Sequence, residues 1–144
     1  MKYVTAALEA LWGVYAWAVF LTSAVFTLIG VTVVPGAGLR QHLATFTCRA
    51  PFRLAFVPVD VIGRDRLPAG HSVVVANHAS YVDGPLLQGF LPARFSFVIK
   101  GEMRNIPIVH YLLRRSGSRF VERFTAAGSA RDARQIVRAA EGGQ

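Results

Sequence analysis

The hydrophobic pattern of the chain is dominated by one uncharged run, which extends from Ala10 to Leu39. As a helix, this run would be about 45 Å long, whereas the hydrocarbon core of a bilayer is about 30 Å thick. The run is too long for the core of a signal peptide. A domain of this size is also too small to cover it on all sides as a buried helix. We therefore predict that residues 1–36 insert into a membrane. They form either one tilted span or a helix pair that breaks near Gly30 or at Pro35-Gly36 and dips into one leaflet.

The next segment, residues 37–56, has the pattern of an amphipathic linker helix. Leu39, Leu43 and Phe46 recur at helical spacing, and polar or basic residues fill many of the positions between them. Such a helix could lie on the membrane surface or pack on the domain that follows. Pro51 is expected to end or kink the helix, because proline lacks an N–H group and clashes with the preceding turn.

From residue 57 onward, strand patterns alternate with helical patterns. The three consecutive valines Val73–Val75 are typical of a strand that is covered on both faces. The pattern predicts strands at 57–61, 72–76, 95–99 and 119–121, and helices at 85–91, 106–113 and 127–141. Strands separated by helices indicate an α/β domain over residues 57–144, with a mixed or parallel sheet that is covered by helices.

Composition and charge narrow the class of partner. Hydrophobic residues make up 53% of the chain and charged residues only 17%, below the roughly 25% that is usual for soluble domains. The formal net charge is nevertheless +8, and nearly all basic residues follow residue 39. Such a basic body beside an apolar segment suits an anionic lipid surface or a phosphate-bearing substrate. Nothing in the sequence has a nucleic-acid-binding pattern, so we expect no nucleic acid partner. Arg114 and Arg115 are expected to face solvent or lipid head groups.

Cysteine usage excludes two kinds of site. Cys48 is the only cysteine, so the chain can form no internal disulfide and no cysteine-based zinc site. We expect Cys48 to be a small structural residue on a helix, and we predict no metal ion and no cofactor.

The segment from Asn77 to Asp83 carries the clearest chemical signal. It follows the predicted valine strand directly and precedes a helix, and ligands of α/β sheets bind at the carboxyl ends of strands. His78 and Asp83 would point about 140° apart on one continuous helix, but they can meet if His78 lies in the turn and Asp83 on the first helical turn. The aspartate would then orient the imidazole, and the histidine could act as a general base. The alternative is an Asn-His loop with an N-capping aspartate.

The same segment resembles the first motif, NHxxxxD, of the glycerolipid acyltransferase family, in which serine often stands at the position of Ser80. Lys100-Gly101-Glu102 followed by Pro107 is similar to the stretch between the family's first two motifs, and the segment from Gly117 to Arg123 is similar to the second motif. The resemblance runs from about Val57 to the C-terminus. It is closest to the bacterial 1-acyl-glycerol-3-phosphate acyltransferases.

The resemblance implies a role for each matching residue. His78 would deprotonate a lysolipid hydroxyl, which then attacks an acyl thioester directly, and Asp83 would orient His78. Arg123 would bind the phosphate of the acceptor, a task suited to a planar guanidinium. Gly117 and Lys100 would belong to the substrate site, although a surface lysine at a strand end is an equal alternative for Lys100.

The implied function is transfer of a fatty acyl group from acyl-CoA or acyl carrier protein to the free hydroxyl of 1-acyl-glycerol-3-phosphate, in phospholipid biosynthesis. The expected location is the bacterial inner membrane, with the catalytic domain on the cytoplasmic side. The alternatives are another lysolipid acceptor and a non-catalytic membrane-binding module of the same fold. Because the family's third and fourth motifs are missing, we expect the domain to be incomplete at its C-terminus. The 144-residue chain by itself is then expected to be inactive or impaired.

Overall fold

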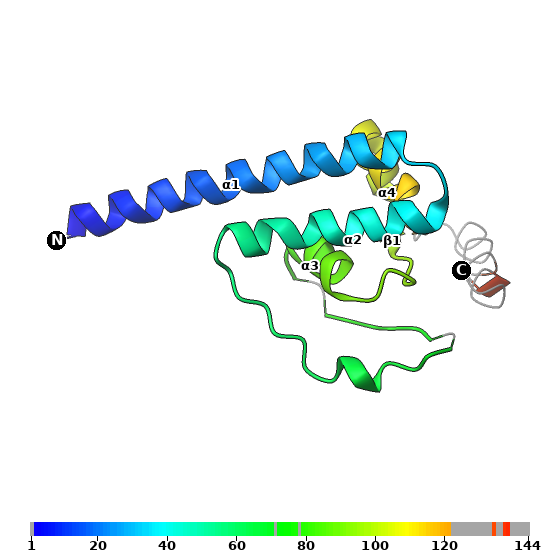
Figure 1. Ribbon diagram of the computed structural model, residues 1–144. Coiled ribbons are helices and arrows are strands. Elements are labelled where there is room, and N and C mark those ends of the chain that lie inside the picture. The colour runs from blue at the N-terminus through cyan, green and yellow to red at the C-terminus, as the bar shows by residue number, and fades with distance from the viewer. Residues whose placement is uncertain (1, 71, 78, 122–133, 135–136, 139–144) are drawn as a thin grey trace.

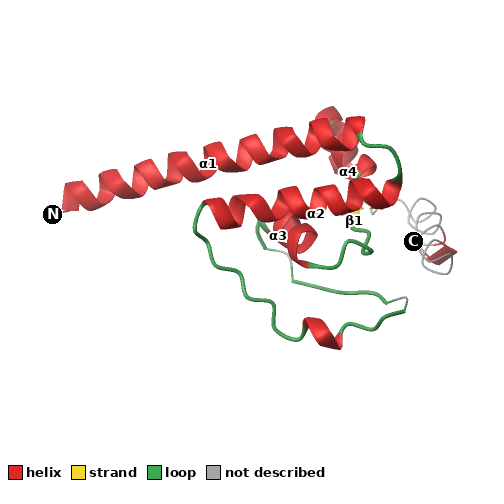
Figure 2. Cartoon of the chain, in the orientation of Figure 1, coloured by secondary structure: helices red, strands yellow, loops and turns green. Residues whose placement is uncertain are grey.

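The computed structural model describes residues 2–70, 72–77, 79–121, 134, 137 and 138. A long helical hairpin of α1 (Lys2–Val33) and α2 (Ala37–Leu54) runs along one side of the molecule (Figure 1). Helix α3 packs on the face of α2 opposite α1, and α4 lies beside the C-terminal end of α1. The remaining elements are α3 (Asp83–Phe90), β1 (Val98–Lys100), α4 (Pro107–Arg115), β2 (Arg119–Val121) and two short 3-10 helices, Arg64–Arg66 and Gly101–Asn105 (Figure 2).

The hairpin turns at the second of the two break points that the sequence suggested. Helix α1 continues without interruption through Gly30, and residues 34–36 connect it to α2. Gly36 has a φ of 80°, in the region that favours glycine. The other end of the hairpin is joined by the Tyr15 hydroxyl, which donates a 2.9 Å hydrogen bond to the carbonyl of Leu54. Residues of α1 that precede Tyr15 therefore extend beyond α2 (Figure 1).

Small and hydroxyl-bearing side chains form the contact between α1 and α2. Ser23, Thr27 and Val31 are the buried residues of α1. Thr27 Oγ1 lies 2.7 Å from Thr47 Oγ1 on α2, and it also donates to the carbonyl of Ser23 at 2.8 Å. A Cβ atom added at Gly30 would lie only 2.2 Å from Cδ2 of Leu43, so this glycine lets the two helices approach closely.

The expectation that Pro51 ends the linker helix is wrong, while the expected kink stays a prediction. Helix α2 continues through Pro51 to Leu54, and Pro51 and Phe52 are buried. Helix α2 packs against both α1 and α3, and this packing offsets the cost of proline in a helix interior, which is about 3 kcal/mol. The helix ends where the N–H of Val57 bonds to the carbonyl of Phe52, with Phe56 in the left-handed region at a φ of 58°.

The sheet is smaller than the sequence predicted. The predicted strands 57–61 and 72–76 are irregular in the structure, so these two expectations are wrong. Within the described residues the sheet consists of β1 and β2, which pair in parallel with Val98 opposite Arg119 and Lys100 opposite Val121. A strand requires a hydrogen-bonded partner, and apolar alternation in one segment cannot supply it.

Other predicted elements are confirmed with small shifts in their bounds. The strand 119–121 is found as predicted, and the strand predicted at 95–99 lies at Val98–Lys100. The helices predicted at 85–91 and 106–113 correspond to α3 and α4. Of the helix predicted over 127–141, Arg134, Val137 and Arg138 are helical, and its other residues lie outside the described part of the chain.

Candidate functional site

A tight turn built by Asp83 precedes α3. The Oδ2 atom of Asp83 accepts hydrogen bonds from the N–H groups of Ala79 and Ser80, both at 2.8 Å. The N–H of Asp83 in turn donates to the carbonyl of Ser80 at 3.2 Å, and the N–H of Val82 donates to the Ser80 hydroxyl at 3.2 Å. Two backbone donors on one oxygen stabilise an ionised carboxylate and fix its direction.

This geometry differs from the N-capping role that was the alternative for Asp83. A capping side chain accepts from N–H groups two or three residues further along the helix, whereas Asp83 Oδ2 accepts from residues that precede it. The N-cap position belongs to Val82, which makes no side-chain capping bond. His78, the predicted general base, lies outside the described residues. The carboxylate is thus fixed on Ala79, the residue that follows His78 in the chain.

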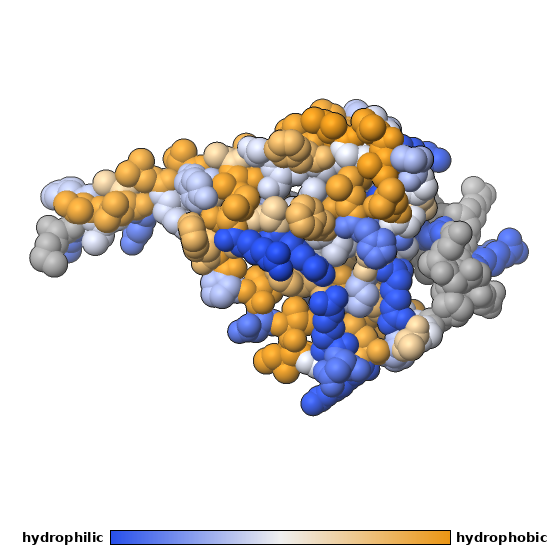
Figure 3. All heavy atoms as spheres, in the orientation of Figure 1, coloured by the Kyte–Doolittle hydropathy of each residue, from blue (hydrophilic) through white to orange (hydrophobic). Residues whose placement is uncertain are grey.

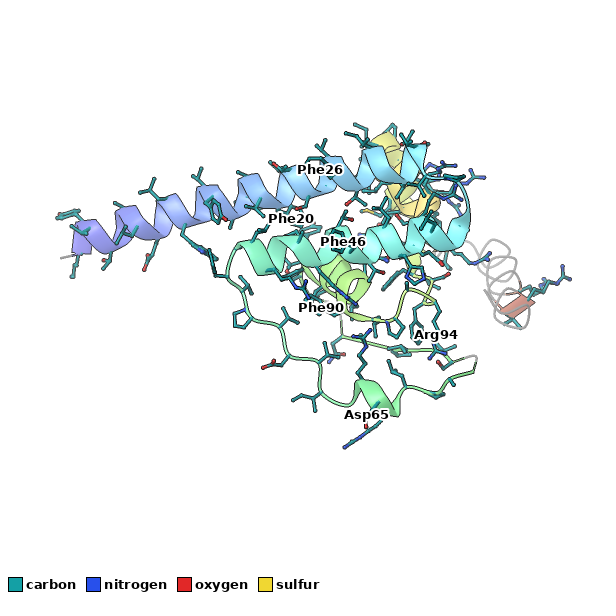
Figure 4. The ribbon with its side chains drawn as sticks, viewed as in Figure 1. Phe20, Phe26, Phe46, Asp65, Phe90 and Arg94 are labelled. Atoms are coloured by element: carbon teal, nitrogen blue, oxygen red, sulfur yellow. The ribbon has the colours of Figure 1, made fainter. Side chains whose placement is uncertain are left out.

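The other end of α3 is fixed to α2. The Arg49 Nε atom donates to the carbonyl of Gly89, and the Arg49 guanidinium lies 5.9 Å from the ring centre of Phe90. Phe52 of α2 packs edge-on against Phe90 at 5.7 Å between ring centres. Figure 4 shows Phe90 on the α3 side of α2. A Cβ added at Gly89 would lie 3.2 Å from the carbonyl oxygen of Cys48, so the backbones of α2 and α3 nearly touch. The turn that holds Asp83 therefore has a fixed relation to the helical hairpin.

Cys48 lies at this crossing and is a free thiol. Burial raises the pKa of the Cys48 thiol from 9.0 to about 11, because an apolar environment disfavours the thiolate. The thiol is therefore protonated at neutral pH and is a poor nucleophile and a poor metal ligand.

Lys100 and Gly117 flank the parallel strand pair. Lys100 ends β1, is exposed, and forms an ion pair with Glu102 at 3.1 Å. Its register partner across the sheet is Val121, which precedes Arg123 by two residues. Arg123 itself lies outside the described residues. Because carboxyl ends of parallel strands meet at the same edge of a sheet, the pairing places Lys100 and Val121 together at that edge.

Gly117 has a structural reason to be glycine. Its φ is 91°, and a Cβ at this position would lie 2.6 Å from Nε2 of Gln41 on α2. The loop before β2 therefore packs closely on α2 and could not accept a larger residue without moving. The substrate-binding role of Gly117 stays a prediction.

Arg115 is a residue whose importance the sequence did not reveal. We expected it to face solvent or head groups, but this is wrong: it is partly buried, with Nε donating to the carbonyl of Val31 at 2.9 Å and Nη2 to that of Thr32 at 3.0 Å. Helix α1 has no basic residue in its own last turn, and a cation there satisfies free carbonyls and the helix dipole. That missing cation was the available signal, but the sequence could not tell which arginine supplies it.

The fold and the turn define a class: an α/β domain joined to a helical hairpin whose first helix is apolar, with the Asp83 carboxylate bonded to the residue that follows His78 in the sequence. The family model described as Acyltransferase matches residues 58–143, which is more than half of the chain. The chain therefore belongs to the acyltransferase family, and the match includes all five predicted site residues. A search of curated proteins and a search of solved structures find no match. The family supports acyl transfer as the general activity.

Proposed function

We propose that this acyltransferase moves a fatty acyl group from acyl-CoA or acyl carrier protein to the free hydroxyl of 1-acyl-glycerol-3-phosphate. The observation that carries the proposal is the Asp83 carboxylate, held by the N–H groups of Ala79 and Ser80 directly after His78. This turn lies within the segment that matches the family. It fixes one partner of the proposed His78–Asp83 pair.

In the proposed reaction, His78 accepts the hydroxyl proton while the hydroxyl oxygen attacks the thioester carbonyl. The C–S bond then breaks, and the leaving thiolate takes the proton back from the imidazolium. The negative charge of Asp83 stabilises the imidazolium between these two steps. Ser80 is not required as a nucleophile, and its hydroxyl supports the turn by accepting the N–H of Val82.

The phosphate of the acceptor is assigned to Arg123 and Lys100. A guanidinium binds phosphate through two parallel hydrogen bonds, and an ammonium adds a point charge. Lys100 already pairs with Glu102, but both side chains are about half exposed. Exposed pairs of this kind contribute only about 0–1 kcal/mol, so an incoming phosphate competes easily for the lysine.

The arrangement of side chains on α1 supports membrane insertion. Helix α1 is the one helix in the described residues that is long and apolar enough to cross a bilayer, a property that signal sequences and core helices share. A core helix, however, would bury its large apolar residues. Here the buried positions are small, such as Ser23 and Thr27, while Phe26, Ile29 and Val33 are exposed. Small residues inside and large apolar residues outside are typical of helices packed in lipid.

We accordingly assign residues 1–36 to a membrane-inserted segment, 37–56 to a linking helix and 57–144 to the catalytic domain. Leu39 and Phe46 of the linking helix are exposed, whereas the residues that contact α3 include Thr45 and Phe52. The apolar side chains Leu39 and Phe46 are therefore available to lipid. The concentration of arginine after residue 39 favours the cytoplasmic side of a bacterial inner membrane for the domain.

The test is an acylation assay on membranes from cells that express the protein in its natural reading frame. Acyl-CoA and acyl carrier protein are each offered with 1-acyl-glycerol-3-phosphate, and the expected product is the diacyl glycerol phosphate. Acylation only of lysolipids that lack the phosphate monoester would favour the alternative acceptor. No acylation of any lysolipid, with folded protein in the membrane, would favour a non-catalytic membrane-binding module.

A further inference from the structure

We propose that α4 is a second membrane contact, whose exposed face lies in the head-group region of an anionic bilayer. The inference rests on the proposed membrane association through α1 and adds a separate surface to it. The partner is lipid rather than another protein, because the exposed face of α4 is continuous with the apolar surface of α1 and because the charge around α4 is basic.

The exposed face of α4 is apolar at its start and basic at its end. Ile108 is 68% exposed and Tyr111 is 42% exposed, and Arg114 is also exposed. These three residues follow one another at intervals of three, so successive ones are about 60° apart and together they span about 120° of the helix surface. The preceding Ile106 is 47% exposed and extends the apolar part. Single exposed apolar residues are common on soluble proteins, but here they form one group.

The continuity of this face with α1 points to lipid. Arg115 bonds to the carbonyls of Val31 and Thr32 and thereby holds α4 at the C-terminal end of α1. The same guanidinium lies 6.0 Å from the ring centre of Tyr111. Near this end, α1 exposes large apolar residues, among them Val33, which is 75% exposed. Figure 3 shows apolar side chains along α1 and around its C-terminal end, where Figure 1 places α4.

Charge around α4 complements an anionic bilayer. The sequence of α4, PIVHYLLRR, contains no acidic residue and ends in Arg114 and Arg115. Arg104, in the 3-10 helix before α4, is exposed and is held by a 3.1 Å hydrogen bond to the carbonyl of Phe120. Apolar side chains flanked by arginine and tyrosine suit the boundary between acyl chains and head groups.

Contact between α4 and the membrane would also orient the strands β1 and β2. Helix α4 connects β1 to β2, and its His110 packs edge-on against Phe120 of β2 at 5.0 Å between ring centres. A bilayer that binds α4 therefore fixes the orientation of the strand pair. That pair carries Lys100 and leads to Arg123, the residues proposed for the acceptor phosphate, so α4 would hold them at the depth of lipid head groups.

The experiment measures the surroundings of Ile108 directly. In a Cys48→Ala background, Ile108→Cys is labelled with a small environment-sensitive fluorophore, and Val73→Cys serves as the matched control. Val73 is an apolar residue that is 84% exposed, but it lies on the irregular segment before the Asp83 turn. The natural full-length protein is mixed with vesicles of phosphatidylglycerol and phosphatidylcholine, and vesicle binding is confirmed by flotation.

On vesicles, the label at residue 108 should gain several-fold in emission and should lose at least half of its quenching by aqueous acrylamide. The label at residue 73 should change little. If the protein floats with vesicles while residue 108 stays as accessible to acrylamide as residue 73, α4 is not a membrane contact, and α1 alone accounts for binding. If the protein does not float at all, the proposed membrane association fails, and this inference fails with it.

Discussion

The guanidinium of Arg49 donates a hydrogen bond to the carbonyl oxygen of Gly89 and so joins α2 to the last turn of α3. This bond spans 40 residues of sequence and links the helical hairpin to the element that begins with Asp83. A hydrogen bond to a charged group contributes about 1.5–3 kcal/mol. The free energy of unfolding should reflect that contribution.

We expect Arg49→Gln to lower the free energy of unfolding by about 1–3 kcal/mol, because it removes the charge-assisted bond and the contact with Phe90. Denaturant titration in detergent micelles, followed by circular dichroism, measures the change. Arg53→Gln is the control, since Arg53 is an exposed arginine of the same helix. Equal effects of the two substitutions would argue against a special role for Arg49.

His78→Ala should reduce the rate of acyl transfer by about 10²–10⁴-fold, the usual contribution of a general base. The measurement is kcat/KM for 1-acyl-glycerol-3-phosphate with purified full-length enzyme. His42→Ala is the control, because His42 is exposed on α2 and should leave the rate within a factor of two. A variant at residue 78 that keeps the wild-type rate would contradict the proposed mechanism.

Two substitutions of Asp83 should separate the effect of its charge on activity from the effect of its side chain on the stability of the turn. Asp83→Asn keeps an oxygen that can accept the N–H groups of Ala79 and Ser80, so the turn should survive while the charge proposed to stabilise the His78 imidazolium is lost. We expect activity to fall nearly as far as in His78→Ala, with little change in stability. Asp83→Ala should lose activity and also about 0.5–1.5 kcal/mol of stability, since the exposed N–H groups of Ala79 and Ser80 exchange their carboxylate acceptor for water. Comparing thermal unfolding of the two variants measures the difference, and equal stability of both would show that the turn does not depend on this side chain.

Arg123→Ala should weaken use of the acceptor more than use of the donor. Loss of a charge-assisted phosphate contact raises the apparent KM for 1-acyl-glycerol-3-phosphate or lowers kcat/KM for it. Steady-state titration of each substrate at saturating levels of the other distinguishes the two. Arg64→Ala is the control, because Arg64 is exposed in the first 3-10 helix. If Arg123→Ala changes only the kinetics of the acyl donor, Arg123 does not bind the phosphate of the acceptor.

Membrane association should resist high salt, because insertion of α1 is apolar and salt screens only the charge contribution. Membranes washed with concentrated salt should keep the protein, and detergent should release it. Leu21→Arg places a charge on the exposed side of α1, where insertion would cost about 2.5–3.5 kcal/mol, and should shift protein to the soluble fraction. Val73→Arg is the control outside the hairpin. Release of the wild-type protein by salt alone would contradict insertion.

The sequence predicted the elements whose signals are local. Helix α4 starts at Pro107, a favoured first helical residue, and α3 ends before Pro92, so both were placed within a few residues. The irregular segment around Val73–Val75 shows the limit of prediction from a local pattern. A run of valines predicts a buried strand, but it does not identify the neighbouring strand that would pair with it. Pro51 shows another limit: a local rule predicted a helix end, and packing on both sides of α2 overrode it.

The candidate site was predictable only in part, for the same reason. The sequence predicted a turn at residues 77–83 followed by a helix that begins near Asp83, and the structure has both, whereas the bonds from Ala79 and Ser80 to the Asp83 carboxylate were not predicted. The contacts of Gly117 with Gln41 and of Arg115 with Val31 join residues more than 70 positions apart. No periodicity within one segment encodes such distant pairs.

The short connection at residues 34–36 has a consequence for the order in which the protein is made. Only the first 54 residues are needed to close the hairpin, and contacts between neighbouring segments form faster than distant ones. The hairpin can thus assemble while the ribosome is still translating the rest of the chain. Helix α2 then presents a finished surface on which α3 docks as it emerges, and Arg115 reaches the end of α1 only after both are in place. Synthesis of the protein at the membrane would therefore anchor the chain before the turn at Asp83 is made.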